Sequence, residues 1–175
     1  YANTFGVNGH KLRGSDYTVD QLIGAAIRNA KAAIATEGRN DVKVALDLGP
    51  LGEMLEPMGT LTFDGAYELF RESVIAGERH GADLVVFETF SDLLELKAGL
   101  LAARENTSLP VFCTMTFTES GKTFAGVSVA SAAVALTALG ASAVGINCSL
   151  GPVQIYPMIQ EMARYTDLPL IVKAN

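Results

Sequence analysis

The chain has 175 residues and a mass of 18.4 kDa, enough for one ordinary domain with a sizeable core and too little for two. Hydrophobic residues make up 49% and charged residues 18% of the sequence, which excludes a disordered, collagen-like or low-complexity chain. The formal net charge is −6 and no basic cluster is present, which argues against nucleic acid as a partner.

Cysteine usage and hydropathy indicate a cytoplasmic protein without a membrane span. Two cysteines are too few for a secreted disulfide scaffold, and the first residues do not resemble a signal peptide. A mostly apolar stretch between Phe124 and Met162 is interrupted by glycine, serine and threonine, and its hydrophobicity rests on alanine rather than leucine. We therefore expect a buried helix and then a buried strand in this stretch.

Short apolar runs alternate with longer helical patterns along the whole chain. In chain order, the pattern predicts the tail of a strand over 1–5, then helices over 19–36, 63–80, 92–105, 129–139 and 153–165, and strands over 42–48, 84–87, 111–116, 143–147 and 168–172. Thr18 with Gln21 offers a capping box at the start of the first helix. Ser91 is the expected N-cap of the third helix, and Pro152 fits the first turn of the fifth.

These repeated units predict an α/β fold with a parallel sheet, because the strands are continuously apolar and each is followed by a helix. The sheet is either open and doubly wound or closed into a barrel, and connection handedness does not separate the two. Polar side chains stand at the carboxyl end of every predicted strand: Asn3, Thr4, Asp47, Glu88, Thr89, Thr114, Thr116, Asn147, Cys148 and Asn175. Their even distribution favours a (β/α)8 TIM barrel, which gathers such positions at one mouth.

Two carboxylates in this set are candidates for chemistry. Glu88 directly ends an apolar strand, where an unpaired charge is costly unless a cation binds it. The alternative for Glu88 is a structural one, in which it favours the dipole of the helix that begins near Asp92. Asp47 precedes a glycine turn, so it is either a functional residue or a cap for that turn. The residues alone leave both alternatives open.

The two cysteines differ in context. Cys113 lies between Phe112 and Thr114 in mid-strand and is expected to be a small buried hydrophobe. Cys148 lies at a strand tip facing a helix N-terminus, which favours a thiolate, and it is a nucleophile, a metal ligand or inert. Neither histidine has the spacing of a metal site, and no dinucleotide-binding or Walker motif occurs.

Several segments together resemble one known family, the homocysteine S-methyltransferases. In order, they are residues 3–6 (NTFG), 47–50 (DLGP) followed by Gly52 and Glu53, 87–92 (FETFSD), 115–117 (MTF), 145–152 (GINCSLGP) and the closing 174–175 (AN). Each block is weak alone, but the ordered set is specific and covers essentially the whole chain. The resemblance is strongest to the cobalamin-dependent branch of the family and to its homocysteine-binding domain.

The resemblance implies a (β/α)8 barrel with a zinc ion held at the mouth by three cysteine thiolates. It assigns the first of these to Cys148, with the other two outside this chain, and it places Asn147 and Asn175 next to the metal. Strands two to seven of the barrel then correspond to this chain. We therefore expect one homocysteine-binding barrel domain over 1–175, truncated at both ends.

The resemblance also implies a substrate and a reaction. Glu88 matches the family glutamate that receives the ammonium group of homocysteine. The other expected substrate-binding residues, which would line the pocket, are Asn3, Thr4, Asp47 and Asn147. Zinc lowers the pKa of the homocysteine thiol, and the resulting thiolate attacks a methyl group to give methionine. The implied donor is methylcobalamin on a separate domain, with cobalamin- and folate-binding modules of the same enzyme as partners.

Other functions stay open at this point. The same thiol activation serves betaine- or S-methylmethionine-dependent homocysteine methyltransferases. A metal-free barrel lyase or hydrolase would use Asp47 and Glu88 as an acid and base pair. Such an enzyme could need a lysine near a strand tip, and the candidate Lys173 is expected to face away from the side of Asn175. An inactive barrel fragment is the remaining alternative.

Overall fold

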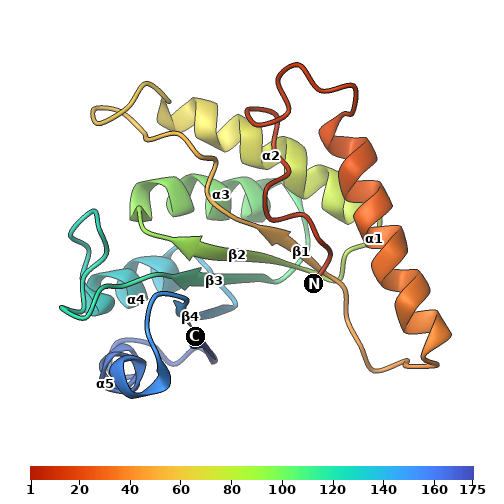
Figure 1. Cartoon of the computed structure of the whole chain (residues 1–175). Helices are drawn as coiled ribbons and strands as arrows, with labels where there is room; N and C mark the ends of the chain where they lie inside the picture. Colours follow the sequence, from red (N-terminus) through yellow and green to blue (C-terminus); the bar gives the residue numbers. More distant parts are fainter.

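Five parallel strands form a single open sheet in the order β1-β2-β3-β4-β5, and a helix precedes each strand along the chain (Figure 1). This computed structural model describes all residues from 1 to 175. The elements in order are α1 (Val19–Thr36), β1 (Ala45–Leu48), α2 (Phe63–Arg79), β2 (Leu84–Phe90), α3 (Leu93–Asn106), β3 (Val111–Met115), α4 (Val129–Ala138), β4 (Ala143–Asn147), α5 (Pro152–Met162) and β5 (Leu170–Lys173). The predicted alternation of helices and parallel strands is therefore confirmed.

The helix starts follow the local capping chemistry. Thr18 and Gln21 form the predicted capping box on α1, and Pro152 begins α5 as predicted. The N-cap of α3 is Asp92 and not Ser91, because the Asp92 carboxylate accepts a hydrogen bond from the Leu94 N–H at 2.8 Å. None of the helices is both long and apolar enough to cross a membrane.

The first five residues are not a strand, contrary to the prediction. They run beside β1 and share only scattered backbone hydrogen bonds with it, from the Ala2 N–H to the Ala45 oxygen at 2.8 Å and from the Gly49 N–H to the Phe5 oxygen at 3.0 Å. Further pairing is interrupted because the Thr4 side chain hydrogen-bonds to the backbone N–H and carbonyl of Asp47, which a neighbouring strand would otherwise bind. The segment still lies next to the edge of the sheet.

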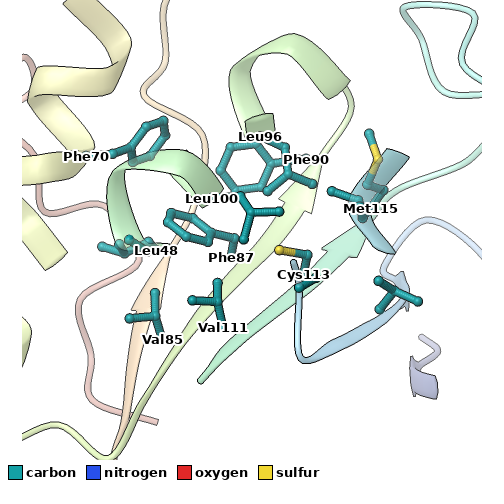
Figure 2. Close-up of a cluster of buried hydrophobic side chains, with 14 of the residues drawn as sticks. Leu48, Phe70, Val85, Phe87, Phe90, Leu96, Leu100, Val111, Cys113 and Met115 are labelled. Carbon is teal, nitrogen blue, oxygen red and sulfur yellow. The ribbon is translucent and has the colours of Figure 1, made fainter. Parts of the chain in front are cut away.

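One face of the sheet packs on the helices and forms the core. Phe70 from α2 meets Phe87 of β2 edge-on with ring centroids 5.5 Å apart, and it meets Phe90 in a tilted arrangement at 6.0 Å. Cys113 lies fully buried on this same face, among apolar side chains (Figure 2). It is the small buried hydrophobe that the sequence predicts, and burial raises the pKa of its thiol.

The other face carries the polar side chains. Along each strand, alternate residues belong to the helix-facing core, such as Leu46 and Leu48 in β1 and Val144 and Ile146 in β4. The residues between them point to the opposite face. That set includes Asp47, Glu88, Thr114, Asn147 and Lys173. The site is therefore built on the face that a closed barrel would turn inward.

Candidate active site

Asn147, at the end of β4, is held by four side-chain hydrogen bonds. Its Oδ1 accepts from the Thr114 hydroxyl at 2.8 Å and from the Thr89 N–H at 2.9 Å. Its Nδ2 donates to Thr89 Oγ1 at 2.7 Å and to the Cys148 sulfur at 3.3 Å. These bonds use the whole capacity of the amide. Asn147, which is only 2% exposed, therefore positions Cys148 and Thr89 and has no side-chain group left for a ligand.

Cys148 is partly exposed at the tip of β4, and its backbone is strained. Its φ is 58° and that of Ser149 is 63°, so two consecutive residues other than glycine are left-handed. Thr89 at the neighbouring strand end has a φ of 68°, which is rare for a β-branched residue. Its hydroxyl oxygen lies 3.9 Å from the Cys148 sulfur. A strained backbone of this kind persists only where surrounding contacts hold it in place, and such residues cluster at functional sites.

Glu88 is paired with Lys173, a contact that the sequence analysis did not expect. Lys173 Nζ contacts Glu88 Oε2 directly, lies 3.4 Å from the hydroxyl of Tyr1, and sits 4.6 Å from the centroid of the Tyr1 ring. The expectation that Lys173 faces away from the site is wrong. Leu170 packs on the core, so Ile171 and Lys173 point to the opposite face by simple alternation along β5. This alternation is the signal that would have found Lys173.

The Glu88–Lys173 pair explains how a carboxylate is accommodated near the end of so apolar a strand. The structure brings a cation to Glu88, while the helix dipole at α3 is served by Asp92 instead. Burial lowers the pKa of Lys173, but the hydrogen bond and charge of Glu88 outweigh it and leave that pKa above its usual value. Lys173 therefore stays charged at neutral pH.

Asp47 is a second carboxyl group on the same face. It is 9% exposed, and its Oδ1 is buried without a hydrogen-bond partner. Burial, with a further contribution from the charge of Glu88, raises the pKa of Asp47 to about 7, against the smaller opposing effect of Lys173. Asp47 is therefore partly protonated near neutral pH. It can accept or donate a proton at this face.

The remaining predicted residues do not join this cluster. The Thr4 hydroxyl donates to the Asp47 carbonyl at 2.8 Å and accepts from the Asp47 N–H at 3.0 Å, so it fixes β1 rather than facing a pocket. Asn3 is exposed and lines a shallow hollow with Asn29 of α1. Asn175 is exposed, and its backbone N–H donates to the Leu150 oxygen at 3.1 Å. The structure thus brings together Asn147 with Cys148, and Asp47 with Glu88.

Comparison with known proteins agrees with this geometry. The sequence profile of the homocysteine S-methyltransferase family matches residues 1–175. The chain belongs to this family. Methionine synthases of Mycobacterium leprae and Mycobacterium tuberculosis are 29% and 30% identical to this chain over 184 and 186 aligned residues. The alignments cover 99% of the chain but only 15% of each mycobacterial protein.

Solved structures show the same fold. The homocysteine methyltransferase MmuM of Escherichia coli superposes in its metallated form with a TM-score of 0.81 at 19% identity, and in its oxidized form with 0.83 at 21%. Each comparison covers 98% of this chain and 64% or 63% of the Escherichia coli chain. The open sheet therefore corresponds to part of a barrel, and the predicted fold, an incomplete (β/α)8 barrel, is confirmed.

Residues 1–175 offer one side chain suited to zinc. Cys148 presents a partly exposed sulfur next to a hydrogen-bond donor, which is the environment of a thiolate ligand. No group of three or more histidine, cysteine, aspartate or glutamate side chains gathers anywhere in the structure. Cys113 cannot join Cys148, because it is fully buried on the helix-facing side of the sheet. Residues 1–175 therefore fit one ligand of a zinc site and do not complete one.

Proposed function

We propose that this domain binds homocysteine and presents its thiol for methylation to methionine. The observation that carries the proposal is the fixed Asn147–Cys148 unit at the same face of the sheet as Glu88. A sulfur ligand and a group for the substrate's ammonium are what an enzyme acting on an amino-acid thiol requires. Membership of the family supports methyl transfer over the acid–base lyase or hydrolase alternative.

In this proposal Cys148 is one ligand of a zinc ion whose other cysteine ligands lie outside residues 1–175. Bound zinc would lower the pKa of the homocysteine thiol so that it reacts as a thiolate. Asn147 holds the Cys148 sulfur through its Nδ2 and fixes the strand end on which that sulfur sits. The existence of a metallated form of the Escherichia coli relative supports this assignment.

Glu88 would receive the ammonium group of homocysteine. It is mostly buried, with its side chain 17% exposed, so a cation bound to it is partly shielded from water. Asp47 lies on the same face and would border the substrate. Asn3 and Asn175 stay in the proposal only as outer contacts, because both are exposed and neither side chain hydrogen-bonds to the cluster.

We further propose methylcobalamin as the methyl donor, carried by a separate module. The methionine synthases that the chain matches are much longer than it is, which leaves room for cobalamin- and folate-binding modules as partners. The test uses the complete protein with homocysteine and, in turn, methylcobalamin, betaine and S-methylmethionine. Methionine formed from methylcobalamin alone supports the proposal. Methionine formed only from betaine or S-methylmethionine would replace the donor, and none from any donor would refute the function.

A further inference from the structure

The contact between Glu88 and Lys173 spans the sheet. Glu88 belongs to β2 and Lys173 to β5, with β3 and β4 between them in the sheet order. The pair can meet because the sheet is curved and both side chains rise from its polar face. Lys173 is the single cationic residue in the five strands. Its side chain is 35% exposed, so it can move without losing a packed position.

This contact occupies the carboxylate that is proposed to bind the substrate. Glu88 would receive an ammonium group, yet in the structure it already holds the ammonium of Lys173. A ligand carrying only an ammonium group would have to displace Lys173 and leave it with Tyr1 as its remaining contact, without a carboxylate partner. Leaving a half-buried charge without its partner is unfavourable. A ligand that also carries a carboxylate gives Lys173 a new partner.

We propose that Lys173 is the residue that recognises the α-carboxylate of the substrate. The amino acid enters between the paired side chains, so that its ammonium group contacts Glu88 and its carboxylate contacts Lys173. Positive and negative groups then alternate, and no charge is left unpaired. The inference rests on the proposed function, and it adds that Lys173 selects zwitterionic thiols over aminothiols that lack a carboxylate.

The surrounding groups suit this role. Tyr1 contacts the Lys173 ammonium with both its ring and its hydroxyl, which limits how far Lys173 can swing from the site. The backbone of Lys173 is fixed as well, because its carbonyl accepts the Cys148 N–H at 3.0 Å. Lys173, whose ammonium group would bind the carboxylate, is thus hydrogen-bonded through its backbone to Cys148, which carries the sulfur. The parallel pairing of β4 with β5, to which this hydrogen bond belongs, keeps the two functions next to each other.

The test compares the complete enzyme with its Lys173→Gln and Lys173→Arg variants. Two ligands are used: L-homocysteine as substrate, and 3-aminopropane-1-thiol, which is homocysteine without its carboxylate, as a competitor. We expect Lys173→Gln to raise the KM for homocysteine about ten- to a hundredfold, as loss of a charge-assisted hydrogen bond does, with kcat within about threefold. The inhibition constant of the aminothiol should stay the same or fall, because this ligand no longer has to displace Lys173 from Glu88. Lys173→Arg should restore most of the KM for homocysteine.

Other outcomes would overturn the inference. Equal losses for homocysteine and for the aminothiol would mean that Lys173 acts only through Glu88 or through folding. A lower KM in Lys173→Gln would mean that Lys173 competes with the substrate. Because both ligands are measured on the same protein, their ratio is independent of how much variant is folded. A wild-type enzyme that does not methylate homocysteine would instead refute the proposed function.

Discussion

The Nδ2 of Asn147 lies 3.3 Å from the sulfur of Cys148, and the other three polar positions of the same amide are occupied by Thr89 and Thr114. The hydrogen bonds of this one amide therefore connect the Cys148 sulfur to the carboxyl ends of three neighbouring strands, β2, β3 and β4. Second partners of this kind orient a metal ligand and adjust its basicity. Asn147 is thus expected to affect metal binding without touching the substrate.

Replacing Asn147 tests this relationship. Asn147→Asp keeps the acceptor for Thr114 and for the Thr89 N–H, but it removes the donor to the Cys148 sulfur and places a negative charge beside it. We expect zinc affinity of the complete protein to fall about 10- to 100-fold, measured by competition with a chelator. Asn147→Ala should in addition destabilise the domain by about 1–3 kcal/mol, because buried partners lose their hydrogen bonds. Unchanged zinc affinity in Asn147→Asp would show that the amide does not act on the sulfur.

Glu88→Gln tests the ammonium site. The substitution keeps the shape of the side chain and removes its charge, so the KM for homocysteine should rise about tenfold or more while kcat changes little. The control is 4-mercaptobutanoate, which is homocysteine without its amino group. Its inhibition constant should respond much less to Glu88→Gln. An equal response of both ligands would place the effect in the protein and not in the ammonium contact.

Asp47 makes stability depend on pH in a defined direction. Its ordinary pKa of 3.8 applies to the unfolded chain, and its pKa in the folded domain is about 7. The folded state therefore binds more protons between about pH 4 and 7, and stability falls as pH rises through this window. Asp47→Asn removes the dependence. The free energy of unfolding of Asp47→Asn, relative to that of the wild-type protein, should thus rise by up to roughly 4 kcal/mol between pH 4 and pH 8, because only the wild-type protein loses stability over this range.

Hydrogen exchange of the β3 amides measures this difference within the complete protein. Asp41→Asn is the matched control, since the exposed Asp41 has its pKa lowered by hydrogen bonding to Arg39 and should give a change of opposite sign. A difference for Asp47→Asn that stays flat with pH would mean that the Asp47 carboxyl is not desolvated in the folded protein.

Sequence reasoning found the elements more reliably than the side-chain partners. Continuous apolar runs and capping residues located the five helices and the five strands, because burial and local hydrogen bonding determine them, but they also predicted a strand over residues 1–5 that does not form. The pairing of Glu88 with Lys173 was missed, because it depends on curvature that joins β2 to β5 across two strands. The extension of β2 to Phe90 was missed too, since the register with β3 shifts between Phe87 and Phe90 and no propensity encodes that shift.

Ser149 offers a test of backbone strain at the site. Its side chain is exposed and makes no hydrogen bond, while its φ of 63° is unfavourable for any residue with a Cβ. Ser149→Gly should stabilise the domain by up to about 1 kcal/mol, the strain released minus the entropy that glycine adds. Ser149→Ala retains the strain and serves as the control. Calorimetry should show a raised Tm for Ser149→Gly alone. Equal Tm values for the two variants would mean that the backbone of Ser149 is not strained.

The most direct test of the account is the zinc content of the complete protein by elemental analysis, compared with its Cys148→Ser and Cys113→Ala variants. The two cysteines lie on opposite faces of the sheet, one partly exposed beside Asn147 and the other fully buried in the core. We expect about one zinc per chain in the wild-type protein and in Cys113→Ala, and loss of zinc in Cys148→Ser. Zinc retained in Cys148→Ser, or absent from the wild-type protein, would contradict this expectation.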